Sequence, residues 1–340
     1  MSGIEHFYYL KAQAQLKAAL DDFQPGHMVF LVGPSGAGKT TLRRSVMQEM
    51  FGNPSNWGRG RIPAIETFAM LPNAAYFSSR ELAKTLVEEL HVPSLDWLFT
   101  GNIIPKSTEE HIRAETAQCA LIWDQLRRHA ATEGDYWKTF RRSLAARGCK
   151  YVSLEQVTAL LVNRRNTSPA EHTLHLMSVA EAAGVMFIMT GIHTATRLWA
   201  IHSELRRRVI TVWMPPYSDK RKGDESHYLR LLKTLSAKYE FSRSDLLCTM
   251  ANDLLAATGG VFAEIVQLLE RATCHARLEG VPRIHKRHIE GAYYNDEDLA
   301  TLWRDIEAFE QAMEPGDVSK RSTLVERRWN SGGTGYGKPS

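Results

Sequence analysis

The sequence predicts an α/β fold in which helices cover both faces of a parallel β-sheet and a small all-helical lid domain follows. Two observations carry this prediction. Residues 33–40 read GPSGAGKT, which satisfies the GxxxxGK[ST] pattern of a phosphate-binding loop (P-loop) between a strand and a helix. Short apolar runs alternate with helical segments up to about residue 218, whereas only helical patterns follow.

The composition is that of a globular protein large enough for about two domains, with 340 residues of which 44% are apolar. No apolar run reaches the roughly 18 residues that span a bilayer, and the N-terminus lacks the features of a secretory signal. We therefore expect a cytoplasmic protein without membrane contact. The four cysteines form no CxxC pair, so neither a zinc site nor a disulfide framework is indicated. A net charge of +4 permits contact with nucleic acid without requiring it.

The nucleotide-binding part begins with an N-terminal helix, predicted within residues 1–27 because apolar positions recur at helical spacing from Phe7. The run Met28–Val32 is too short for a helix and reads as a buried strand, and the segment from Thr41 has helical character. Strand, loop and helix in this order are the context that a P-loop requires.

Two further buried strands are predicted at 150–154 and 185–190, each after a helix that ends at a glycine, Gly148 and Gly184. Together with a last strand near 212–215 they define an α/β domain over residues 28–218. The long interval 52–147, with a helical pattern over 108–132, is expected to be an insertion. Residues 219–313 are expected to form the helical lid, and residues 314–340 a flexible tail.

Every position of the P-loop has a predicted function in holding ATP. The glycines allow backbone N–H groups to converge on the phosphates at a helix N-terminus. Lys39 would reach the β- and γ-phosphate oxygens, and the Thr40 hydroxyl would ligate Mg²⁺. The predicted phosphate-binding set is Gly33, Pro34, Ser35, Gly36, Ala37, Gly38, Lys39, Thr40 and Thr41.

An acidic residue that organises Mg²⁺ or activates water is expected at the end of a neighbouring strand. Glu155 is the favoured candidate, because Asp124 lies in a segment of helical period. Where an Asp-Glu pair is expected the chain has Glu155-Gln156. Either Glu155 organises the metal and an amide, Gln156, takes the place of the general base, or the register is shifted and Glu155 is the base. Thr190, and less so His193, could contact the γ-phosphate or the attacking water.

Three consecutive arginines, Arg206, Arg207 and Arg208, end a short helix-like segment. They could simply complement the negative C-terminal dipole of that helix. Alternatively, one of them could reach the γ-phosphate that a neighbouring subunit holds, as an arginine finger supplied in trans, which can accelerate hydrolysis about 10³- to 10⁵-fold.

The order of these motifs, with Thr258-Gly259-Gly260 in the lid, resembles the AAA+ ATPases. Within them, the stretches IHTATRLWAIHSELRRRV and TGGVFAEIVQLLERATCHARLEGVPRIHKRHIE resemble the TniB/TnsC transposition regulators, particularly TnsC of CRISPR-associated transposons. The resemblance spans most of residues 6–295. It departs from the family pattern at Glu155-Gln156 and after Gly260, where Val261 to Glu264 replace the sensing arginine of many AAA+ proteins, which puts the hydrolysis rate in doubt.

The resemblance implies a bacterial ATPase that assembles as a ring or filament on duplex DNA. It implies partners as well: a transposase, and a target-selection complex of a TniQ-type adaptor with a CRISPR effector. It assigns Mg²⁺ or hydrolysis to Glu155, sensing to Thr190, and the finger to Arg206, Arg207 or Arg208. Another AAA+ machine, such as a helicase loader or signalling ATPase, and a P-loop small-molecule kinase remain as alternatives.

DNA contact requires only Lys and Arg side chains that face the duplex. The candidates are basic residues in or near the interval 52–147: Lys106, Arg113, Lys138, Arg141, Arg142, Arg147 and Lys150. The alternative for each is an ordinary solvated position.

Overall fold

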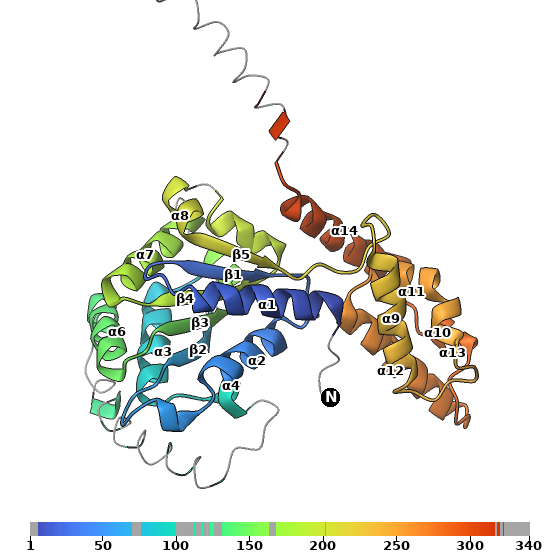
Figure 1. Cartoon of the computed structure of the whole chain (residues 1–340), viewed down its shortest axis with the longest axis horizontal. Helices are drawn as coiled ribbons and strands as arrows, with labels where there is room; N and C mark the ends of the chain where they lie inside the picture. Colours follow the sequence, from blue (N-terminus) through green and yellow to red (C-terminus); the bar gives the residue numbers. More distant parts are fainter. Residues whose placement is uncertain are drawn as a thin grey trace, which may run out of the picture.

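The computed structural model describes residues 6–69, 76–99, 131–162, 168–200 and 202–316, with isolated positions between 106 and 125 and between 318 and 322. Its α/β part and its helical part lie side by side (Figure 1). Of the tail predicted over 314–340, residues 323–340 lie outside the described part, as does Arg113. No helix in the described ranges is long and apolar enough to cross a membrane.

The α/β part is built on a five-stranded parallel sheet in the order β2-β3-β4-β1-β5. The strands are β1 (Met28–Val32), β2 (Ala64–Phe68), β3 (Tyr151–Glu155), β4 (Met186–Gly191) and β5 (Val209–Trp213). Every residue of β1, β3 and β4 is buried, which is why apolar residues predominate in these three strands. Because all strands are parallel, their carboxyl ends meet at one edge of the sheet.

Helices cover both faces of the sheet, as the alternating pattern predicted. On one face α1 (Phe7–Asp21) packs against α2 (Lys39–Phe51), which leads from the P-loop. The connection from β1 to β2, which contains α2, crosses the sheet in one direction, and the later connections cross it in the other. Because such connections are right-handed, the later ones place their helices on the other face. These helices are α3 (Ser79–His91), α6 (Glu133–Arg147), α7 (Pro169–Ala183) and α8 (Ser203–Arg208). The short α4 (Asp96–Phe99) contacts α2, and the 3-10 segments η1 (Pro54–Asn56), η2 (Val157–Leu161) and η3 (His193–Leu198) connect the larger elements.

The lid has its own apolar core, but helices from both ends of the chain connect it to the sheet domain (Figure 1). Tyr8 of α1 packs into the lid core, and Phe309 of the last helix packs into the sheet core with its ring edge on Trp213. The lid region contains α9 (Asp224–Ser236), α10 (Leu246–Thr249), α11 (Ala251–Thr258), α12 (Phe262–Leu278), α13 (Lys286–Glu290) and α14 (Asp296–Met313).

The interval 52–147 is not simply an insertion, because it supplies a strand of the sheet. β2 pairs in register with β3, with Glu66 opposite Ser153. A buried glutamate in the middle of β2 conceals the strand from a search for apolar runs. Within the same interval, Asp124 is helical, as its sequence context predicted.

Candidate nucleotide site

The P-loop follows β1 at the carboxyl edge of the sheet and runs into the first turn of α2. Gly36 and Gly38 adopt φ angles of 75° and 89°, which lie in the left-handed region that side chains disfavour. The N-terminus of α2 begins directly after Gly38. Its free N–H groups and the positive end of its dipole therefore face the loop, as an anion site requires.

Lys39 is folded back onto the loop, where its ammonium donates to the carbonyl oxygens of Gly33 at 2.9 Å and Pro34 at 2.7 Å. Burial lowers the pKa of Lys39 to about 8, although the nearby Glu155 carboxylate acts in the opposite direction. Such an ammonium has lost much of its hydration and gains from an anionic partner. A phosphate group beside it would supply that partner.

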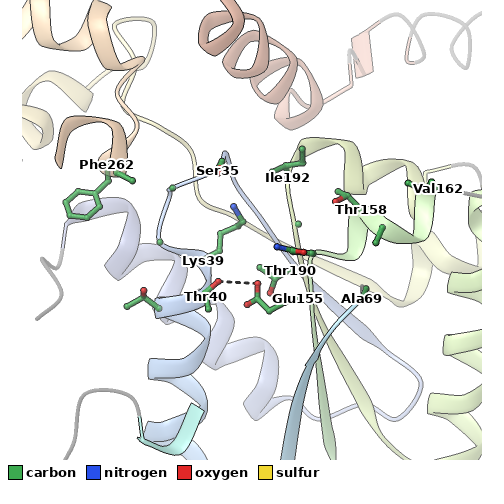
Figure 2. A pocket seen from close by; sticks show the side chains of 17 residues that line it. Ser35, Lys39, Thr40, Ala69, Glu155, Thr158, Val162, Thr190, Ile192 and Phe262 are labelled. Atoms are coloured by element: carbon green, nitrogen blue, oxygen red, sulfur yellow. Dashed lines mark hydrogen bonds between the residues drawn. The ribbon is translucent and has the colours of Figure 1, made fainter. Parts of the chain in front are cut away.

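A pocket of about 1000 Å³ opens beside the loop (Figure 2). Its lining combines the P-loop, the ends of β3 and β4, and the start of α12, and among the described residues Lys39 is the sole cationic side chain in it. The lining includes Lys39, Thr40, Glu155, Gln156, Thr190 and Phe262. The pocket thus lies where the sequence placed the phosphates.

Thr40 and Glu155 come together in the pocket, where the Thr40 hydroxyl donates to Oε2 of Glu155 at 3.2 Å (Figure 2). A hydroxyl and a carboxylate oxygen are ligands that suit Mg²⁺, which prefers oxygen donors. The residues present therefore fit a magnesium ion bound mainly through nucleotide phosphates. The other oxygen of Glu155, Oε1, is held by Arg43 of α2, a partner that the sequence did not reveal.

Gln156 follows the buried strand β3 and has a left-handed backbone with φ 54°. Its exposed side chain lines the pocket beyond Glu155. The side chain that borders Thr40 is thus Glu155, and the residue after it carries an amide.

Thr190, the last residue but one of the central strand β4, has a buried side chain, only 1% exposed, and its hydroxyl oxygen has no hydrogen-bond partner within the described part of the chain. An unsatisfied buried hydroxyl is costly unless a ligand or water completes it. Thr190 and Ile192 line the pocket, whereas His193 does not. Burial lowers the pKa of His193, which is half-buried at the start of η3.

The lid touches the P-loop directly. The backbone N–H of Ala263, in the first turn of α12, donates to the Gly36 carbonyl at 3.2 Å, and a Cβ added at Gly36 would lie only 2.6 Å from that of Ala263. Phe262 lines the nucleotide pocket and stacks on His6, which precedes α1. The lid, α1 and the loop thus meet at one place.

Solved structures share this fold at low sequence identity. The Aeropyrum pernix ORC2 protein in its ADP form superposes with a TM-score of 0.50 at 14% identity, over 84% of this chain and 66% of that one. This chain thus spans slightly under two thirds of the length of ORC2. It has the P-loop AAA+ fold. The Walker-type ATPase PABY2304 of Pyrococcus abyssi gives a TM-score of 0.47 at 13% identity, over 88% of both chains. Family models and curated proteins give no match.

Within this AAA+ fold, the arginine cluster lies far from the phosphates of its own chain. Arg208 immediately precedes β5, whose first residue pairs with Met28 at the start of β1, whereas the P-loop follows the end of β1. The two sites are separated by the length of a five-residue strand, roughly 13 Å at 3.3 Å per residue. Figure 1 shows α8 at the sheet edge remote from the lid.

The three arginines differ in their surroundings. Arg208 makes two hydrogen bonds to the carboxylate of Glu181 in α7, at 2.8 and 3.2 Å. Arg206 and Arg207 are exposed and pair with no carboxylate within the described residues. Two of the three side chains are therefore available to another molecule.

The predicted DNA contacts fall into three groups. The exposed ones are Lys106, Lys150 and the α6 residues Lys138, Arg141 and Arg142. Arg147 is 7% exposed and donates to the Gly60 carbonyl at 2.6 Å, so it belongs to the interior and does not offer its guanidinium to DNA. Arg113 lies outside the described residues.

Proposed function

We propose that the chain is an ATP-dependent regulator of DNA transposition that assembles on target duplex DNA. In this proposal it couples a target-selection complex, a TniQ-type adaptor with a CRISPR effector, to the transposase in the bacterial cytoplasm. The AAA+ fold and the nucleotide pocket support the ATP-dependent part. The resemblance to TniB/TnsC regulators along most of the chain motivates the transposition part.

The observation that carries self-assembly is the separation of Arg206 and Arg207 from the nucleotide pocket of their own chain. Both are exposed at the opposite edge of the sheet, roughly 13 Å or more from the P-loop. Their guanidinium groups can stabilise a triphosphate only if a second copy presents its pocket to them. Complementing the dipole of α8 is a weak function, because a helix of six residues provides at most about 1 kcal/mol at an exposed end.

The same geometry supports functions for the residues in the pocket. Lys39 and the loop N–H groups hold the phosphates, and bound Mg²⁺ would stabilise their charge. Glu155 borders Thr40 and organises the metal, whereas Gln156 stands where a general base is expected. Since an amide accepts no proton at neutral pH, hydrolysis is slow, and ATP acts chiefly as an assembly signal. Thr190 senses the γ-phosphate or the attacking water through its unpartnered hydroxyl.

The contact with DNA is assigned to the exposed face of α6. Lys138, Arg141 and Arg142 are spaced three and four residues apart and share one side of the helix. A sequence-independent interaction of this kind weakens steeply with salt, with a slope of about −0.9 for each phosphate contact. Replacing all three by alanine should reduce that slope by up to about 2.7 while leaving nucleotide binding unchanged.

Electron microscopy and light scattering with ATP, ADP or no nucleotide, each with and without duplex DNA, test the proposal. ATP with DNA should give rings or filaments, and Lys39→Ala should abolish them. Arg206→Ala or Arg207→Ala should block assembly or ATP turnover while monomeric nucleotide binding persists. Arg208→Ala, the matched control whose partner Glu181 lies in the same chain, should have a smaller effect on assembly.

A particle that stays monomeric with ATP and DNA would refute the assembly proposal and favour a small-molecule kinase. Assembly without capture of a transposase, but with capture of a helicase, would instead identify a helicase loader. Co-purification with the transposase and the TniQ-type adaptor, compared between wild type and Lys39→Ala, separates these outcomes.

A further inference from the structure

Arg43 lies one turn after Thr40 on the P-loop helix, and its side chain is completely buried. Its Nε and Nη2 atoms reach the same oxygen of Glu155, Oε1, at 2.9 and 2.8 Å. Nη2 also lies 2.7 Å from Oε2 of Glu66, and Nη1 donates to the Ser153 hydroxyl. One guanidinium thus links α2 to both β2 and β3 directly beneath the pocket.

The charges of this network balance. Glu66 and Glu155 contribute two carboxylates, and Arg43 with Arg44 contributes two guanidinium groups, since Arg44 pairs with Glu66 at 2.7 Å. A buried arginine is tolerated only if its charge and donors are matched. Removing the fully buried Arg43 therefore costs much more than removing an exposed ion pair would, and it releases the carboxylates of Glu66 and Glu155.

The geometry divides the two oxygens of Glu155 between separate partners. Arg43 takes Oε1, and Oε2 is the atom that accepts from Thr40. We propose that Arg43, held in turn by Glu66, is a positioning residue that fixes the Glu155 carboxylate with Oε2 toward the metal site.

The positions of these residues favour this function over simple core filling. Ser153 and Glu155 are two residues apart on β3 and face the same side of the sheet, and Ser153 pairs in register with Glu66. The edge strand β2 is thereby connected to the nucleotide site through one side chain, that of Arg43, which contacts both Glu66 and Glu155. This proposal depends on the proposed function, because it assigns to Glu155 the metal-organising function given above.

The test measures how strongly Mg²⁺ tightens nucleotide binding. The affinity for a fluorescent ATP analogue is titrated against Mg²⁺, with the affinity in EDTA as the baseline, for wild type, Arg43→Lys and Arg44→Lys. A lysine cannot hold Glu155 and Glu66 together, so Arg43→Lys should raise the Mg²⁺ concentration for half-maximal tightening by about tenfold or more. Its affinity in EDTA should match that of wild type.

Arg44→Lys is the matched control, because Arg44 pairs with Glu66 but not with Glu155. It should leave the Mg²⁺ dependence unchanged, even if both variants unfold at a lower temperature. If Arg43→Lys does not fold, Glu66→Gln is measured in its place, because this substitution keeps the side-chain shape and removes one charge. It should raise the Mg²⁺ concentration for half-maximal tightening by about threefold.

An unchanged Mg²⁺ dependence in Arg43→Lys or Glu66→Gln, or an equal shift in Arg44→Lys, would overturn the positioning function. Failure of the nucleotide-binding part of the proposed function, on which this proposal rests, is a different result: wild type would then bind no nucleotide, or would bind it equally with and without Mg²⁺. The wild-type titration therefore distinguishes loss of nucleotide binding from failure of the positioning function, and the particle size with ATP and DNA separately reports failure of assembly.

Discussion

Raising the pH from 7 to 9 should weaken ATP binding, because Lys39 loses its proton over this range only in the free protein. Burial lowers the pKa of the free Lys39 ammonium to about 8. Once a triphosphate lies against it, the added negative charge raises that pKa. The contribution of Lys39 to affinity is therefore nearly complete at pH 7 and is lost as the pH rises through 8.

The size of the effect follows from the protonated fraction of free Lys39. With a pKa of about 8, about nine tenths of the side chains carry the proton at pH 7 and about one tenth at pH 9. If the bound form stays protonated throughout, the affinity falls about tenfold, or about 1.4 kcal/mol of binding free energy. The same linkage requires ATP binding at pH 8 to take up about half a proton.

Isothermal titration calorimetry at pH 7, 8 and 9, in pairs of buffers with different ionisation enthalpies, measures affinity and proton uptake together. Lys39→Arg is the control, since a guanidinium with a pKa above about 12 stays charged across this range; its affinity should change little with pH. A wild-type affinity that is flat from pH 7 to 9, without proton uptake, would refute the reasoning.

Three further changes test separate parts of the site. Gln156→Glu supplies a carboxylate where a base is expected, so single-turnover ATP hydrolysis should rise, by about 10²-fold or more. Gly36→Ala puts a side chain on a left-handed backbone, which costs roughly 1–2 kcal/mol, and its Cβ would clash with Ala263 of the lid; nucleotide affinity should therefore fall. Gly184→Ala is the control: its backbone cost is the same, but its Cβ would meet no atom within 4 Å, so nucleotide binding should be normal. Tyr8→Phe removes a donor to the buried Asp224, and urea denaturation should show a loss of roughly 1–3 kcal/mol.

The strands around the P-loop were predictable because they are buried on both faces. The segments 28–32, 150–154 and 185–190 correspond to β1, β3 and β4 within one residue at each end. The last strand was placed too late, since β5 begins at Val209. Only Val212 of its five residues is fully buried, although the segment VITVW is largely apolar, and its start follows directly on the three arginines Arg206 to Arg208.

The edge strand β2 and the partner of Glu155 escaped prediction for one common reason. Both depend on charged residues in the interior, and a search for apolar runs rejects such positions. A signal was nevertheless present: Arg43 falls between Leu42 and Val46, on the buried side of the P-loop helix. A cation on a buried helix face requires carboxylate partners from other elements, and Glu66 and Glu155 fulfil that requirement.

The two ends of β5 explain how nucleotide could control assembly without rapid hydrolysis. Past its carboxyl end, the Met214–Tyr217 segment borders the P-loop and the lid, with Tyr217 bonded to Gly260. Its amino end follows directly from Arg208. β5 is an edge strand of the parallel sheet, and all five of its residues pair with β1, so it is a stiff connection between these two ends. In the proposed assembly, β5 would therefore connect the lid and P-loop of one copy to the arginines proposed to serve the next copy.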